Sequence, residues 1–267
     1  MAAKMDPKRR ELYVEGKKDR LFLKWLTLGR ISTNSKILDS SFVEIDESQG
    51  GEKERLILFA KLAEDKAKNI KFFIDKDFDR FLLRDYPNNL WSTDLNDMEG
   101  YLFEESNINK CCLLGCRFDK TDPMIIFNKA IEYAINIGCL RLVSKKFDLK
   151  LSINKSKVTK YIKKSGDKIH FNFKSYIVAV IQNSGQRQDL INSISMRLSE
   201  LKSTLSGIDP IYLVRGKDVI LIFSRILALK GVKLTNFEEI FWSSINEKNL
   251  QSYKNLSDVV SYLCESV

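Results

Sequence analysis

Short apolar runs and amphipathic stretches alternate along the first 75 residues, and this alternation predicts strands connected by helices. Runs typical of strands occur at residues 12–14, 42–45 and 70–74. Apolar side chains at helical spacing predict one helix from Asp19 onward and a second over residues 52–68. This order favours an α/β protein with a parallel sheet and helices on both faces, whose functional groups gather beyond the carboxyl ends of the strands.

The pattern of the remaining chain is mainly helical. Pro123 begins a predicted long helix that ends near residue 146, and a further strand is expected at residues 149–153. Three more helices are predicted, at residues 190–205, 218–230 and 257–264. We therefore expect an α/β catalytic domain at residues 1–147 and a basic, mainly helical domain at residues 148–267.

Composition narrows the classes of function. No apolar run approaches the roughly 18 residues of a membrane span, so a soluble, cytoplasmic protein is expected. The five cysteines are odd in number and lack paired zinc-site spacing, which indicates reduced thiols. His170 is the single histidine, which excludes two-histidine RNase chemistry and HExxH metalloprotease chemistry. Any hydrolytic chemistry must therefore depend on carboxylates.

Positive charge is concentrated in one segment. The chain carries a formal charge of +9, and residues 141–174 hold eleven Lys or Arg against only Asp148 and Asp167. This segment is the candidate for contact with nucleic-acid phosphates, through Lys155, Lys157, Lys160, Lys163 and Lys164. The alternative is a solvated lysine-rich face that binds nothing in particular.

The first acidic pair follows the first predicted strand. Glu15 lies at the strand end before a glycine, and Asp19 lies four residues later, in the first helical turn. Both side chains can reach the same side of the turn and share an ion. The alternative is that Asp19 only caps the helix.

The second acidic pair follows an almost continuous apolar run. Asp75 and Asp77 are two residues apart, so in extended chain their side chains point the same way. Two adjacent carboxylates repel each other unless a cation compensates, which favours a hard metal ion with oxygen ligands. A solvated aspartate-rich loop that continues through Asp79 and Arg80 is the competing interpretation.

The third acidic pair, Asp97 and Glu99, is expected at the start of a helix capped by Thr93 or Asp94. Acids are favoured at helix starts by the helix dipole, so this pair indicates a site only in combination with the other two.

The segments ELYVEGKKDRLF, FFIDKDFD and TDLNDMEGYLF together resemble the Toprim nucleases of the OLD family and, more closely, the nuclease effector of the PARIS anti-phage system. The resemblance covers roughly residues 11–146. A fainter match at residues 213–218 includes Gly216 and Asp218, and Lys217 stands there in place of an expected histidine. The resemblance implies a Toprim fold that holds Mg²⁺, or Mn²⁺ in its place, for phosphodiester hydrolysis.

The resemblance also implies roles for individual residues. Glu15, Asp75 and Asp77 would be direct metal ligands, with Glu15 as an alternative general base. A second ion or its waters would be held by Asp19, Asp97 and Glu99. OLD-type sites are further supported by a downstream lysine, for which Lys145 and Lys146 are the candidates.

The sequence is compatible with three functions. The first is a toxin-like nuclease effector of phage defence, with RNA and in particular tRNA as the favoured substrate and DNA nicking as the alternative. The resemblance implies an ATPase partner or a homodimer, and nucleotide-driven sensing would need another polypeptide, because the chain has no GxxxxGK[ST] motif of its own. The second is another Toprim enzyme, such as a primase or a topoisomerase fragment. The third is a non-catalytic binding module.

Overall fold

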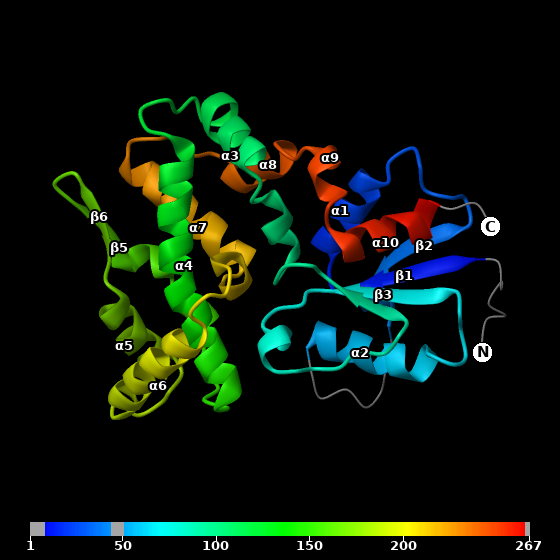
Figure 1. The fold of residues 1–267 in the computed structure, drawn as a ribbon, viewed down its shortest axis with the longest axis horizontal. Coiled ribbons are helices and arrows are strands. Elements are labelled where there is room, and N and C mark those ends of the chain that lie inside the picture. Colours follow the sequence, from blue (N-terminus) through cyan, green and yellow to red (C-terminus); the bar gives the residue numbers. More distant parts are fainter. Residues whose placement is uncertain (1–8, 44–50, 265–267) are drawn as a thin grey trace. The chain divides into compact units, whose positions relative to one another are not determined.

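The computed structural model describes residues 9–43 and 51–264, which form two compact units (Figure 1). The first, here called the sheet unit, consists of residues up to Met98 together with the segment from Glu247 onward. The second, the helical unit, is Glu99–Asn246. The helical unit is thus inserted into the sheet unit, whereas the sequence predicted two consecutive domains with a boundary after residue 147.

The sheet unit contains four parallel strands in the order β2-β1-β3-β4. They are β1 (Arg10–Val14), β2 (Ser35–Asp39), β3 (Ile70–Ile74) and β4 (Leu90–Ser92). The predicted α/β class with a parallel sheet is confirmed.

One predicted strand was placed wrongly. The second strand is β2, whereas Ser40–Phe42 forms a turn of 3-10 helix and residues 44–45 lie outside the described part of the chain. In β2 the consecutive residues Ile37 and Leu38 are both buried, while Phe42 is 57% exposed. A strand covered on both faces shows no alternation, which is why the pattern pointed to the wrong residues.

Helices cover both faces of the sheet (Figure 1). Helix α2 (Glu52–Ala63) packs against β3, while α1 (Lys17–Leu26) and α10 (Lys254–Cys264) pack against other strands of the sheet. Helix α2 ends earlier than the predicted residue 68, because the chain turns at residues 64–66 to enter β3.

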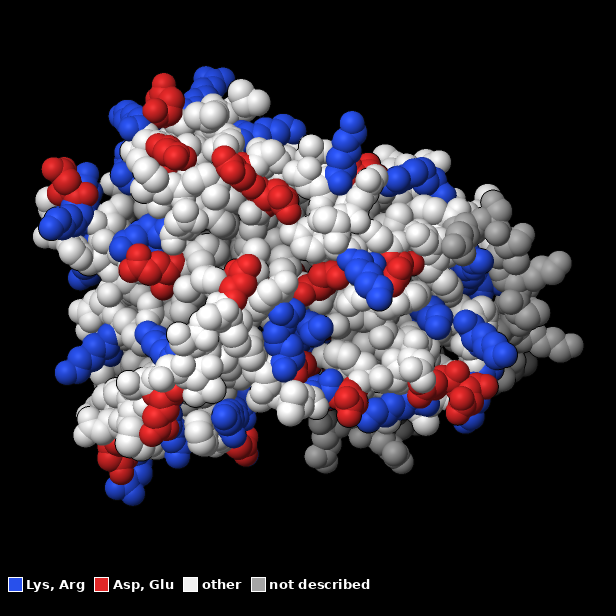
Figure 2. Space-filling view, viewed as in Figure 1, with Lys and Arg blue, Asp and Glu red and all other residues white. Residues whose placement is uncertain are grey.

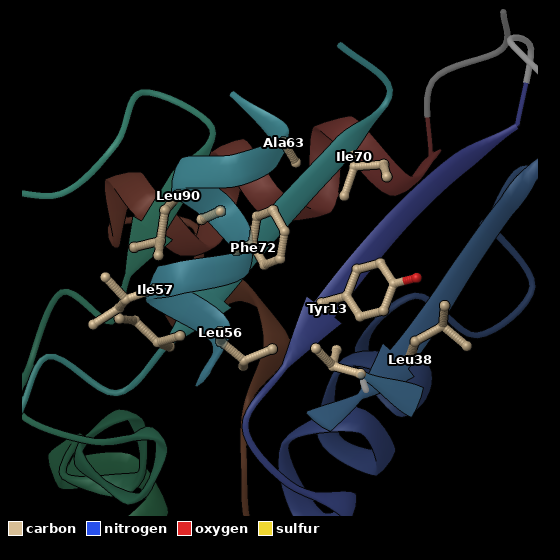
Figure 3. Close-up of a cluster of buried hydrophobic side chains, with 11 residues drawn as sticks. Tyr13, Leu38, Leu56, Ile57, Ala63, Ile70, Phe72 and Leu90 are labelled. Carbon is tan, nitrogen blue, oxygen red and sulfur yellow. The ribbon is translucent and has the colours of Figure 1, made fainter. Parts of the chain in front are cut away.

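The core under α2 aligns the two central strands (Figure 3). Tyr13 of β1 stacks on Phe72 of β3 with ring centroids 5.6 Å apart, and Phe59 of α2 contacts both rings edge-on at 5.2 and 5.1 Å. Buried aromatic packing of this kind holds β1 and β3 in one register. The residues that follow each strand therefore emerge side by side at the same edge.

Helix α10 returns to the sheet unit and is capped by a distant residue. The Asp94 carboxylate accepts the backbone N–H groups of Asn255 at 3.0 Å and Leu256 at 3.2 Å, and the Asn255 side chain donates to the Ser92 carbonyl at 2.8 Å. Asp94 was predicted as a possible cap for the segment directly after β4, but its carboxylate instead accepts the N–H groups at the start of α10. Helix α10 begins at Lys254, earlier than the predicted residue 257.

The helical unit is built around the predicted long helix, α4 (Pro123–Lys146), capped by the Asp122 carboxylate, which accepts the Met124 N–H. The other main elements are α3 (Glu105–Lys110), β5 (Ile162–Ser165), β6 (Lys168–Phe171), α5 (Phe173–Asn183), α6 (Leu190–Thr204), α7 (Gly216–Leu229) and α8 (Phe237–Ser243). The unit is largely helical, as predicted.

The lysine-rich segment differs from its predicted structure. Asp148 and Lys150 adopt left-handed backbone conformations, with φ of 47° and 51°, so the expected strand at residues 149–153 does not form. Instead β5 and β6 pair as an antiparallel hairpin further along the chain. The hairpin was not predicted, because both strands are only four residues long and lie within the lysine-rich segment.

Among the helices of the described residues, none combines the length and apolar character needed to cross a membrane. The five cysteines, which all lie in the described part of the chain, are free thiols, as predicted.

Candidate functional site

The carboxyl edge of the sheet brings the first and second acidic pairs together. Strand β1 pairs with β3 so that Val14 lies opposite Phe73, and the next residues leave the sheet at the same edge. There the Glu15 carboxylate accepts the backbone N–H of Asp75 at 2.8 Å. Sixty residues apart in sequence, Glu15 and Asp75 are thus in direct contact, as strand-end geometry predicted.

Glu15 lies in an environment that disfavours its negative charge. Burial raises the pKa of Glu15 from 4.5 to about 7, against the opposing effects of Lys53 and the Asp75 N–H, while Asp77 and Asp19 raise it further. A carboxylate with this pKa can exchange a proton near neutral pH and gains stability from an added cation. Glu15 therefore has the properties expected of a general base or of a metal ligand.

Backbone contacts hold the loops after β3 and β4 together beside Glu15. Asp75 is buried, and its carboxylate accepts the Met98 N–H at 3.2 Å. Asp77 donates its N–H to the Asn96 carbonyl at 2.6 Å and adopts a left-handed conformation with φ of 51°. That conformation is uncommon outside glycine, and residues held in it are concentrated at functional sites.

A lysine that the sequence did not indicate lies among these acids. The Lys53 ammonium is 3.1 Å from Asp77 Oδ2, 2.8 Å from Asp79 Oδ2 and 3.2 Å from the Lys76 carbonyl oxygen. Burial lowers the pKa of Lys53, but the surrounding carboxylates of Asp77, Asp79 and Glu15 outweigh burial and leave it raised. Lys53 is therefore a charged, enclosed cation within the candidate site.

Asp79 is a buried member of the same cluster, in contrast to the solvated loop considered from the sequence. Its side chain is 4% exposed and accepts a hydrogen bond from the Tyr86 hydroxyl at 2.6 Å, in addition to the contact with Lys53. The signal was present in the sequence, because IDKDFD places three aspartates at alternating positions. Lys53 carried no comparable signal, since it follows a Gly-Gly pair at the start of a helix.

Asp19 has the capping role considered from the sequence. Its Oδ2 accepts the Gly16 N–H at 2.9 Å, which stabilises the first turn of α1. Its charge still acts on Glu15, whose pKa it raises. The capping interpretation is confirmed, and a role in metal binding stays a prediction.

The third acidic pair divides between the two units. Asp97 belongs to the sheet unit and is fully buried, whereas Glu99 begins the helical unit within a 3-10 helix, Met98–Leu102. The predicted α-helix at this point is thus a tighter and shorter element. Within the helical unit, the Lys217 ammonium is 3.7 Å from Glu99 Oε2.

The remaining residues named by the resemblance lie in the helical unit. Asp218 of α7 forms a two-point ion pair with Arg141 of α4, at 2.9 and 3.0 Å, which joins the two helices. Gly216 is the buried first residue of α7. Lys145 and Lys146 are exposed in the last turn of α4, within the helical unit, where lysine matches the helix dipole.

The predicted nucleic-acid contacts are all exposed to solvent; they are Lys155, Lys157, Lys160, Lys163 and Lys164. Lys163 and Lys164 belong to β5 of the hairpin. On the face shown in Figure 2, basic side chains are interspersed with acidic ones.

Beside the hairpin, an open pocket of about 460 Å³ is lined by Lys129, Glu132, Tyr133, Lys168, Ile169, His170 and Phe171. The lone histidine therefore lies with basic and aromatic residues.

The oxygen donors at the sheet edge are of the type that Mg²⁺ binds, and the buried charge of Glu15 would be stabilised by such an ion. Their arrangement is nevertheless not that of a formed metal site. Within residues 9–43 and 51–264, no group of three or more His, Cys, Asp or Glu is placed to hold a metal ion. The nearest carboxylates contact backbone N–H groups and Lys53, so metal binding by Glu15, Asp75 and Asp77 requires these side chains to reorient.

No protein-family model matches the chain, and no curated protein matches its sequence significantly.

Proposed function

We propose that this protein is a Mg²⁺-dependent nuclease of the Toprim type. The observation that carries the proposal is the contact between Glu15 and Asp75 at the carboxyl ends of neighbouring parallel strands, with Asp77 directly after them. In an open parallel sheet this edge is where ligands bind. The raised pKa of Glu15 adds support, because strongly perturbed carboxylates are concentrated at functional sites.

The sequence motifs also suggest a biological role for the proposed nuclease. The acidic motifs resemble those of AriB, the nuclease effector of the PARIS anti-phage system, which implies RNA, and tRNA in particular, as substrate. It also implies control by a separate ATPase and assembly as a homodimer.

In the proposed reaction, Glu15, Asp75 and Asp77 would hold the metal, and within the same unit Asp19 and Asp97 would be available for a second ion or for its waters. Bound Mg²⁺ would lower the pKa of a coordinated water and offset charge on the phosphate. In the alternative role Glu15 would leave the metal to the aspartates and act as the general base, because its pKa of about 7 in the metal-free protein allows proton transfer at neutral pH.

The basic segment of the helical unit is the proposed contact for the nucleic-acid backbone. Its lysines would bind phosphates with little dependence on base sequence and with strong dependence on salt. The hairpin adds Lys168 and His170, which line the pocket beside Tyr133 and were not among the predicted contacts.

A cleavage assay tests the proposal. Purified wild type, Glu15→Gln and Asp75→Asn are incubated with end-labelled tRNA and with supercoiled plasmid, in Mg²⁺, in Mn²⁺ and in chelator. Glu11→Gln is the matched control, because Glu11 lies on the same strand at the opposite end. We expect metal-dependent tRNA cleavage by wild type and control, and a loss of about 100-fold or more in the two site variants.

The other outcomes separate the alternatives. Plasmid nicking without tRNA cleavage would indicate DNA as the substrate, in the manner of OLD nucleases. Equal cleavage by all folded variants would show that the acidic residues are not catalytic. The non-catalytic binding module would be favoured if folded wild-type protein cleaves neither tRNA nor plasmid and if its expression in cells is harmless. The capping role of Asp19 and the ion pair of Lys53 are the observations that favour this second candidate.

A further inference from the structure

The Lys53 ammonium occupies a complete binding site of its own. Its three hydrogen-bond donors have three acceptors within reach, which are Asp77 Oδ2 at 3.1 Å, Asp79 Oδ2 at 2.8 Å and the Lys76 carbonyl at 3.2 Å. The Lys53 side chain is only 12% exposed. Lysine is rarely buried to this extent unless its charge is paired, so the site is built around a cation.

The atoms that surround Lys53 are also the atoms that a divalent cation prefers. Carboxylate and backbone carbonyl oxygens are the usual ligands of Mg²⁺ and Ca²⁺. Asp77 is shared between the two roles, because it is both a partner of Lys53 and a proposed metal ligand. Two cations a few ångströms apart repel strongly in a partly buried site, so an ammonium on Asp77 opposes a metal ion there.

We propose that Lys53 is an internal counter-cation that competes with the metal ion for Asp77. Metal loading then requires the Lys53 ammonium to leave Asp77, while its bond to Asp79 can remain. Asp79 is suited to keep Lys53, because it is nearly fully buried and is held by the Tyr86 hydroxyl. This inference depends on the proposed metal site and gives it a form of regulation: the carboxylates stay neutralised until Mg²⁺ displaces the lysine.

Direct measurement of metal binding tests the inference without using nuclease activity. Binding of Mn²⁺ to the full chain is followed by the decrease of the free-ion signal in electron paramagnetic resonance. The variants are Lys53→Met, which removes the charge while keeping the apolar stem, and Asp75→Asn, which removes a proposed ligand. Lys61→Met is the matched control, because Lys61 is an exposed lysine of the same helix.

We expect Lys53→Met to bind Mn²⁺ about tenfold more tightly than wild type, because a like charge has been removed beside the ion. Lys61→Met should stay within about twofold, since solvent screens its charge. In chelator, Lys53→Met should have a lower melting temperature than wild type, and Mn²⁺ should raise it by more than it raises that of wild type.

Each remaining result is decisive. Unchanged or weaker Mn²⁺ binding by folded Lys53→Met overturns the competition, and the proposed metal site survives if Asp75→Asn still abolishes binding. Absence of Mn²⁺ binding in every variant removes both the competition and the metal site. If Lys53→Met does not fold, the double variant with Asp79→Asn decides, because asparagine keeps the Tyr86 hydrogen bond without a buried charge.

Discussion

Replacing Glu15 by glutamine should stabilise the metal-free protein at alkaline pH. Glutamine has the size of glutamate and can still accept the Asp75 N–H, but it carries no charge to bury. The pKa of Glu15 is raised from 4.5 to about 7, so protonation is favoured in the folded state. The charged side chain therefore opposes folding, with a penalty that begins above pH 4.5 and is full above about pH 7.

The size of this effect follows from the shift in pKa. A difference of 2.5 units between 7 and 4.5 corresponds to about 3 kcal/mol of unfolding free energy, and partial solvent screening reduces it to about 2 kcal/mol. Below pH 4.5 the side chain is protonated in both states and the penalty is absent. It develops as the pH rises from 4.5 to 7 and is complete at pH 8.

Urea unfolding of wild type, Glu15→Gln and the Glu11→Gln control measures the effect in chelator at pH 8 and pH 5. The variant should exceed wild type by about 2 kcal/mol at pH 8, and most of this difference should disappear at pH 5. Added Mg²⁺ should stabilise wild type but not the variant, so the difference at pH 8 should shrink or change sign. If wild type and Glu15→Gln have equal unfolding free energies at pH 8 as well as at pH 5, burial does not control the charge of Glu15.

Two further predictions concern the C-terminal helix and the hairpin. Asp94→Ala should lower the unfolding free energy by about 1–2 kcal/mol in urea titrations, because α10 loses both cap hydrogen bonds, whereas Asp94→Asn should retain most of the stability. Charge reversal of Lys163 and Lys164 should weaken tRNA binding in filter assays and reduce the slope of log affinity against log salt by about one for each phosphate that is no longer bound. An unchanged slope would assign both lysines to a solvated face.

The parts of the fold that depend on local pattern were predictable. Strand β3 and the aspartates after it follow from an apolar run that ends in alternating acids. The meeting of Glu15 with Asp75 follows from the rule that parallel strands end at one edge of the sheet. Strand β2 was misplaced because burial on both faces removes the alternation that marks a strand.

The parts that depend on tertiary contact were not predictable. Lys53 enters the acidic cluster only because α2 packs over β3, and nothing in its local sequence distinguishes it from other helical lysines. Asp94 has the residue type of a cap, but the helix that it caps lies about 160 residues further along the chain. Pattern shows what role a side chain can fill, whereas only the folded chain shows which partner it meets.

The return of α10 to the sheet has a consequence for the order in which the protein is made. Its buried residues Leu256, Val259 and Leu263 belong to a helix that contacts β2 and β4, so the apolar cover of the sheet comes partly from the last described segment. The ribosome releases this segment after the whole helical unit has been synthesised. The sheet therefore lacks this cover while the helical unit is being synthesised, and a nascent chain cannot assemble the complete sheet unit until α10 has followed.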